Sequence, residues 1–361
     1  MADTEHDSSG SLASEAFRIV NDLNRPNPTI YWTDFLCSLF VAFGAATLYL
    51  EGAFPVWARL VLYFVSVGGL YRVGTFNHEV AHLPRGTVRG FKTAWNLLAG
   101  IPMLTPSFLY VCHLEHHRVR RYGTSGDGEY LPLAHDTGKG HACFFLQVLF
   151  LPFLVVLRFA LLGPLSFLHP SLRRWTIERA SSLAIHWHPD SRRRLSAGDP
   201  TGWWAVLDLA CSARVWMMLL APTFGWTEWS RLPLLYSLAV GVLVLNQLRT
   251  LAAHRFLSEG DRLDHDQQFL DSTNITGSWY SEYLFPLGLR YHALHHLLPS
   301  LPYHSLGKAH RRLLAALPPE SPYRQNLFPS LLSVLRELRR QRLARHEDAR
   351  AKWDRWQNAK S

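Results

Sequence analysis

Apolar residues in this chain of 361 occur in long blocks that short polar or charged segments separate. The blocks at residues 31–50 and 55–73 approach the roughly 20 residues that a helix needs to cross a bilayer. The link near Glu51 is short, so these two blocks predict an antiparallel hairpin. Residues 203–226 and 232–251 predict a second hairpin. The pattern therefore predicts an all-α, multi-pass membrane protein with four transmembrane helices in two hairpins.

Two other apolar stretches carry interruptions. Residues 95–110 are short and contain two prolines, and residues 143–168 are broken by Pro152 and Arg158. We expect both to be interfacial helices or to dip into the membrane and return. The following loop, residues 171–194, is rich in arginine, and basic residues in short loops favour the cytoplasmic side. Four crossings keep this loop and the histidines described below on that side, whereas five would separate them.

The two ends of the chain differ from its middle in composition. Residues 1–28 are polar and predict a flexible tail that is not a signal peptide, residues 29–328 a membrane domain, and residues 329–361 a basic helical tail. The net charge is 37 − 28 = +9, and arginines flank the apolar blocks. This arrangement indicates contact with an anionic membrane surface and no nucleic-acid partner. The four cysteines lie far apart, so we expect them to be reduced.

Three histidine clusters and one isolated histidine carry the candidate chemistry. Within each cluster the spacing is three or four residues, which puts the imidazoles on one face of a helix. The eight clustered imidazoles are too many for one zinc ion with about four ligands. They suit two ions with open positions, and imidazole is a good ligand for iron. The candidate metal ligands are His78, His82, His113, His116, His117, His254, His292, His295 and His296.

The strings NHEVAH, HLEHHR and HALHHLLP, in this order and spacing, resemble the histidine boxes of the membrane fatty acid desaturase superfamily. The middle string resembles the sphingolipid desaturase branch, and the segment after the last box resembles acyl-lipid desaturases. The resemblance covers about residues 30 to 315. It implies four membrane helices and a cytoplasmic helical cap that holds a di-iron centre, whose ligands are the nine histidines.

The resemblance also implies an activity and partners. O2 is the cosubstrate, electrons come from an external cytochrome b5-like or ferredoxin-like donor, and a double bond is introduced into the acyl chain of a fatty acid or lipid. Stearoyl-type relatives carry an asparagine four residues before the isolated histidine. Thr250 stands there in this chain, with Asn246 one turn further back, so the last ligand of the second iron stays open.

Other side chains are candidates for supporting roles. Acids that orient metal-bound imidazoles are a common device, and the candidates are Asp127, Glu79, Glu115 and Asp271. An acidic electron donor fits a basic surface, for which the candidates are Arg118, Arg120, Arg121 and the loop 171–194.

Three alternatives compete with desaturation. The same nine histidines serve a hydroxylase or ketolase that acts on a lipid or carotenoid. An intramembrane zinc metallopeptidase is the second alternative, because HEVAH is an HExxH motif in which Glu79 is the general base, but it leaves both HxxHH boxes unexplained. A metal transporter is the third, and it needs ligands near mid-depth in the membrane. The lipid, the carbon attacked and the oligomeric state do not follow from the sequence.

Overall fold

The computed structural model describes residues 11–84, 86–130, 139–183, 193–277 and 279–358. Helices dominate these residues, as predicted, and β-structure is limited to two short strands and isolated bridges. Five helices are long and apolar enough to cross a membrane, which makes this a multi-pass membrane protein. They are Pro28–Glu51, Val56–His82, Ala142–Ser166, Thr201–Leu220 and Arg231–Ala253.

The first predicted hairpin is formed by α2 (Pro28–Glu51) and α3 (Val56–His82), which pack along much of their length. Proline at the first position and the Asn27 side chain, which accepts from the amides of the first turn, start α2. Gly52 ends it in the left-handed conformation, at φ +73°. Gly69 lets the helices approach closely, since a Cβ there would lie 2.9 Å from the Cα of Ala42. The α3 helix extends nine residues beyond the predicted apolar block and carries the first histidine box.

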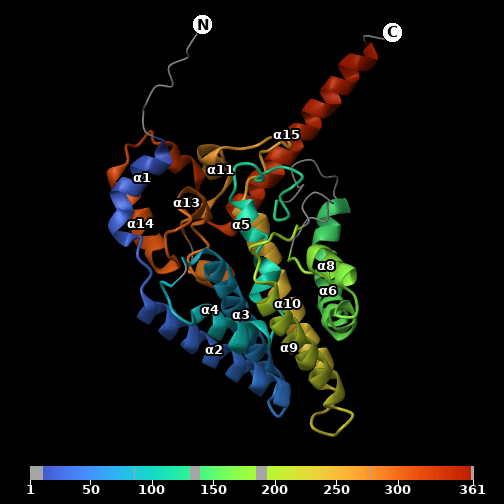
Figure 1. Cartoon of the computed structure of the whole chain (residues 1–361). Helices are drawn as coiled ribbons and strands as arrows, with labels where there is room; N and C mark the ends of the chain where they lie inside the picture. The colour runs from blue at the N-terminus through green and yellow to red at the C-terminus, as the bar shows by residue number, and fades with distance from the viewer. Residues whose placement is uncertain (1–10, 85, 131–138, 184–192, 278, 359–361) are drawn as a thin grey trace.

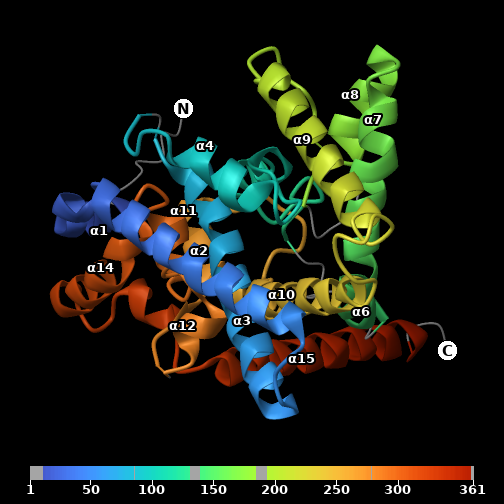
Figure 2. The same ribbon diagram turned by 90° about the horizontal axis from the view of Figure 1, so that it is seen from below.

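The two helices expected to form the second hairpin are α9 (Thr201–Leu220) and α10 (Arg231–Ala253), which are joined by the loop at the bottom of Figure 1. The α10 helix packs against α3 and α6. Seen from below, α9 diverges from α10 and packs instead against the segment that includes α7 (Figure 2).

The fifth candidate span departs from the four predicted. It comprises α6 (Lys139–Leu157), a π-helical stretch η5 (Arg158–Leu162) and α7 (Gly163–Ser166). The interruptions that argued against a crossing are accommodated in a helix: Pro152 lies inside α6, and buried Arg158 donates to both carboxylate oxygens of Asp208 on α9, each at 2.9 Å. Arg173 on α8 (Pro170–Arg179) pairs with the same carboxylate. The charge of Arg158 is therefore buried with a partner.

Residues 95–110 form no long helix, in line with the prediction. They belong to α4 (Phe91–Trp95), a π-helical turn η2 (Asn96–Gly100) and a 3-10 turn η3 (Ser107–Tyr110). The short helix α5 (His113–His116) follows and carries most of the second histidine box.

The remaining elements form a helical cap over one end of the long helices (Figure 1). The third box lies on α13 (His292–Leu297), which contacts α11 (His265–Asp271) and α14 (Tyr303–Ala316). The strands β1 (Asn274–Ile275) and β2 (Leu327–Phe328) pair in parallel. Two short helices complete the cap, α12 (Ser281–Leu284) and η7 (Pro322–Asn326).

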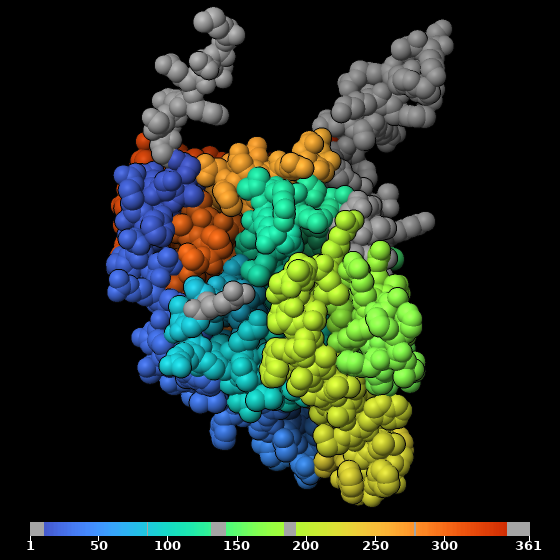
Figure 3. Space-filling model, in the orientation of Figure 1, coloured from blue at the N-terminus to red at the C-terminus, as the bar shows by residue number. Residues whose placement is uncertain are grey.

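Both ends of the chain contain helices that pack against the cap. Within the first 28 residues, α1 (Leu12–Val20) and η1 (Asn21–Leu23) are folded, and Ala16 and Val20 are fully buried against cap residues. The space-filling view shows these blue residues beside the red-orange C-terminal third (Figure 3). The α1 helix is short and begins at the N-cap residue Ser11. Its few apolar residues do not stand out in a polar segment, so composition alone predicted a flexible tail. The C-terminal residues form α15 (Leu331–Asn358), whose Val334 is buried in the cap.

Candidate metal centre

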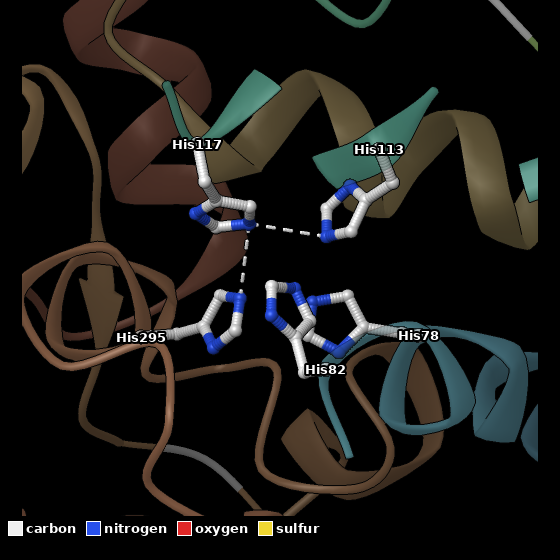
Figure 4. Close-up of side chains that lie close together, drawn as sticks. All are labelled: His78, His82, His113, His117 and His295. Atoms are coloured by element: carbon white, nitrogen blue, oxygen red, sulfur yellow. Dashed lines mark hydrogen bonds between the residues drawn. The ribbon is translucent and has the colours of Figure 1, made fainter. Parts of the chain in front are cut away.

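The nine candidate histidines meet in two groups. His78 and His82 come from the end of α3, His113 and His117 from α5 and its C-terminal cap, and His295 from α13 (Figure 4). These five form the first group. The second group comprises His116, His254, His292 and His296. Within each group the potential ligand atoms all lie within 4.8 Å of one another.

The closest nitrogens in these groups face one another. The Nε2 atoms of His117 and His113 are 3.1 Å apart, and those of His117 and His295 are 3.2 Å apart. In the second group, Nε2 of His292 lies 3.1 Å from that of His254 and 3.2 Å from that of His296. Neighbouring nitrogens about 2.1 Å from a shared ion at right angles would be about 3 Å apart. The spacing therefore fits two metal sites.

Unpartnered ring nitrogens give a second test of that fit. Both nitrogens of His78 and Nε2 of His82 are buried without a hydrogen-bond partner. A buried polar atom without a partner is costly, and a cation held by these lone pairs removes that cost. The donor set of imidazoles alone suits iron, copper or zinc rather than calcium or magnesium.

Burial keeps most of these rings neutral, as metal binding requires. It lowers the pKa of six of them well below the ordinary 6.5. These are His113, His117, His254, His292, His295 and His296. His116 is the exception: burial alone would lower its pKa, but the Asp127 carboxylate raises it above the ordinary value.

Buried hydrogen-bond acceptors orient two of the rings through Nδ1. Asp127 lies 2.8 Å from Nδ1 of His116, as predicted for an orienting acid, and Glu129 lies 2.8 Å from Nδ1 of His113. Each carboxylate accepts Nδ1–H and so leaves Nε2 free as a ligand. Glu129 was missed in the sequence because its spacing from the second box follows no helical period. Its only signal is an acidic pair in a basic segment.

A tyrosine orients the ring of His254 in a similar way. The Tyr122 hydroxyl donates to Asp271 at 2.9 Å and lies 2.8 Å from Nδ1 of His254. Since its proton goes to Asp271, the tyrosine oxygen accepts from Nδ1–H. Asp271 therefore acts on His254 through Tyr122, a residue that sequence reasoning also missed.

The other two candidate acids have different roles. Glu115 pairs with Arg118, Arg120 and Arg121 at the surface, so the prediction that it orients a ring is wrong. Glu79 is buried; its Oε2 accepts from the Tyr31 hydroxyl at 2.6 Å, and its Oε1 lies 3.5 Å from Nδ1 of His78, a candidate ligand. The Tyr31 contact ties α2 to α3 and engages the carboxylate that a peptidase would need as its base.

Among the described residues, the position that was left open in the sequence forms no hydrogen bond with either group. The Thr250 hydroxyl donates to the backbone carbonyl of Asn246, and the Asn246 side chain accepts from Arg249. The second group consequently offers four imidazoles where the first offers five. Another histidine, His310, is buried with Nδ1 2.8 Å from the Tyr323 hydroxyl and lies outside both groups.

The fold and the site define a multi-pass helical membrane protein with a buried histidine centre suited to two metal ions. Residues 54–327 match the family model for fatty acid desaturase. A ceramide hydroxylase from Caulobacter vibrioides (strain NA1000 / CB15N) is 39% identical over 350 residues, which is 94% of this chain and 96% of that protein. The chain belongs to the fatty acid desaturase family, and it is an oxidoreductase of that superfamily.

Proposed function

We propose that this protein is a membrane di-iron oxygenase that hydroxylates a hydrocarbon chain of a ceramide-like lipid. The observation that carries the proposal is the meeting of nine histidines in two groups, in a chain 39% identical along nearly its whole length to a ceramide hydroxylase. The desaturation favoured from the sequence yields to the hydroxylase alternative, because the similarity to that relative is the observation that distinguishes the two outcomes.

In this proposal the first group (His78, His82, His113, His117 and His295) holds one iron. The second group (His116, His254, His292 and His296) holds the other. The irons supply O2 activation, which the breaking of an unactivated C–H bond requires and which side chains alone do not provide. One oxygen atom enters the product and the other leaves as water, with two electrons from the carrier and two protons. Glu129, Asp127 and Tyr122 fix the rings so that their lone pairs point inward.

We further propose four crossings, with the histidines on the cytoplasmic side. His82 ends α3 and His254 follows α10, and both lie in the same centre, so an even number of crossings separates them. Three candidate spans lie between these histidines, so one of them must enter the membrane and return to the same side instead of crossing it. Beyond α8 the Leu183 amide donates to the Leu109 carbonyl at 2.9 Å, beside the second box and before α9 begins. This contact supports the segment of α6 and α7 as the one that returns.

Product analysis tests the proposed reaction. The protein is expressed in a host that makes or is fed ceramide, under ¹⁸O2, beside His295→Ala and the control His265→Ala, whose histidine is exposed and outside both groups. We expect ceramide to gain one labelled oxygen with the wild type and the control, but not with His295→Ala. Loss of two hydrogens would instead establish desaturation, and no change in any lipid would refute both.

The electron donor is expected to dock on the basic surface around the second box. Arg118 and Arg120 share one carboxylate, Glu115, so two positive charges face one negative charge there. Charge complementarity mainly sets the association rate and makes it depend on salt. We expect Arg118→Glu with Arg120→Glu to slow turnover driven by an acidic carrier and to leave turnover with a small chemical reductant unchanged. Equal carrier-driven rates at low salt would exclude this surface.

A further inference from the structure

A pocket of about 340 Å³ lies between α8 and the start of α9. Arg173 and Arg174 of α8 line it, together with Thr201 and Trp204 of α9 and three apolar residues. The pocket shares no residue with the two histidine groups. Its chemistry is therefore separate from that of the metal centre.

The pocket lies on the same side of the membrane as the metal centre. The α9 helix leads into the loop at the bottom of Figure 1, so Thr201 at its start lies at the opposite end, toward the cap. The chain around the pocket is tied to the segment that precedes the second histidine box. The Leu183 amide donates to the Leu109 carbonyl at 2.9 Å, and Nη1 of Arg193 donates to the Phe108 carbonyl at 3.0 Å.

The surroundings of the pocket are those of a lipid head-group layer. Trp175 on α8, Trp203 on α9 and Leu168 just before α8 are exposed. Tryptophan favours the layer where hydrocarbon meets head groups. Further along α9, Val206 and Leu209 expose apolar side chains within a candidate membrane span. A lipid whose head enters the pocket thus has apolar helix surface beside it for its acyl chains.

Positive charge exceeds negative charge at the pocket. Arg173 shares the carboxylate of Asp208 with Arg158, so two positive charges face one negative charge. Arg174 donates through Nε to Glu178 at 3.1 Å, which leaves its two amino groups without a hydrogen-bond partner among the described residues. The planar fork of donors on a guanidinium matches the oxygens of a phosphate.

A third guanidinium lies against one wall of the pocket. Arg193 is placed over the Trp204 ring, 3.9 Å from its centroid, and only 7% of its side chain is exposed. Its Nη2 is buried without a hydrogen-bond partner in the described structure, 3.8 Å from Asp199. An anion in the pocket would offset the repulsion between these positive charges.

We propose that this pocket binds the phosphate of an anionic membrane phospholipid, with Arg173 and Arg174 as the donors. The exposed apolar side chains of α9 favour a lipid as the source of the phosphate, because a free phosphate ion makes no use of them. A bound head group tethers α8 to the membrane surface beside the metal centre. The proposal does not depend on the reaction that the centre catalyses.

Native mass spectrometry of the full-length, iron-loaded protein in a mild detergent tests the site. Phosphatidylglycerol, phosphatidylcholine of the same chain length and inorganic phosphate are titrated separately into the wild type, and the fraction of protein that retains each gives its affinity. Phosphatidylglycerol is also titrated into Arg174→Gln and into the matched control Arg179→Gln, which removes the same charge from an exposed position of α8 outside the pocket. We expect the control to bind phosphatidylglycerol like the wild type. Arg174→Gln should bind it about tenfold more weakly, because a hydrogen bond between charged groups contributes on this scale.

Thr201→Asp is an independent test of the same pocket. Its carboxylate is favourable in the first turn of a helix but repels a phosphate in the pocket. We expect this variant to keep the wild-type melting temperature and to lose phosphatidylglycerol.

Four outcomes would overturn the proposal. The first two are equal affinity of Arg174→Gln and Arg179→Gln for phosphatidylglycerol, and undiminished binding by Thr201→Asp. The third is a wild type that binds phosphatidylcholine as tightly as phosphatidylglycerol, since the net negative charge then plays no part. The fourth is displacement of the lipid by inorganic phosphate at equal concentration, which would make the pocket a site for the free ion.

Discussion

The contact of Tyr122 with His254 offers a sharp test of the second metal site. In Tyr122→Phe the hydroxyl that accepts from Nδ1–H of His254 is lost, and the nearest other acceptor is the Ser272 hydroxyl at 3.2 Å. Asp271 keeps the Leu257 amide on Oδ1 but loses the tyrosine from Oδ2. The ring of His254 is then free to turn or to change tautomer, so its Nε2 is no longer fixed toward the second group.

The size of the effect follows from the role of the hydroxyl. Loss of an outer-shell partner weakens metal binding about 10–100-fold, which corresponds to about 1.4–2.7 kcal/mol. Only the second group should be affected, because none of the histidines in the first group contacts Tyr122 in the described structure. We expect one of two irons to bind weakly and the other to bind as in the wild type.

Tyr323→Phe is the matched control. Tyr323 is also buried, and its hydroxyl lies 2.8 Å from Nδ1 of His310, the same distance as in the Tyr122 pair. Tyr122→Phe loses two buried hydrogen bonds and Tyr323→Phe loses one, each at a cost near 1 kcal/mol in stability, but His310 belongs to neither group. Anaerobic Fe²⁺ titration against a chelator measures both affinities. If Tyr122→Phe and Tyr323→Phe bind iron equally well, the assignment of His254 to a metal site is refuted.

Three further predictions concern the helices and the charge of the centre. Gly69→Ala brings a Cβ within 2.9 Å of the Ala42 backbone and should lower the melting temperature. The control Gly44→Ala, whose Cβ would have nothing within 4 Å, should not lower it, and equal melting temperatures would contradict close α2–α3 packing. Asp208→Asn leaves Arg158 buried without its counter-charge and should destabilise the protein by about 3–5 kcal/mol. Denaturant unfolding in mixed micelles measures the loss of stability, and a loss below about 1 kcal/mol would mean that water reaches the pair. Burial lowers the pKa of most of the histidines in the two groups, so below the ordinary pKa of 6.5 the unfolded chain binds more protons than the folded chain. The metal-free protein should therefore lose stability as the pH falls from 7 to 5. A melting temperature that does not change with pH would show that these rings are already protonated or hydrated in the folded protein.

The sequence predicted what repeats at a regular spacing. The i, i+3 and i, i+4 histidines share a helical face whatever the tertiary fold, and the eight clustered histidines all lie in the two groups, with the isolated His254 in the second. Apolar blocks likewise predicted the hairpin of α2 and α3 and the second pair of long helices. Both signals are local, so one sequence is enough to read them.

What the sequence did not give depends on partners distant along the chain. Arg158 was treated as an interruption of an apolar stretch because its partner, Asp208, lies 50 residues away. Glu129 and Tyr122 act on histidines through a loop whose path no periodicity describes. The short helix α1 packs into the folded protein because α14 covers its apolar side.

The second box sends adjacent residues to different groups, since His116 belongs to one and His117 to the other. The third box does the same with His295 and His296. One short helix turn in each box thus contributes to both histidine groups, and backbone geometry would set the separation between the two proposed metal ions. A single inserted or deleted residue within either turn would rotate each imidazole by about 100° and exchange or empty its coordination sphere. Such indels should therefore abolish both sites together, while the same change in a surface loop would spare them.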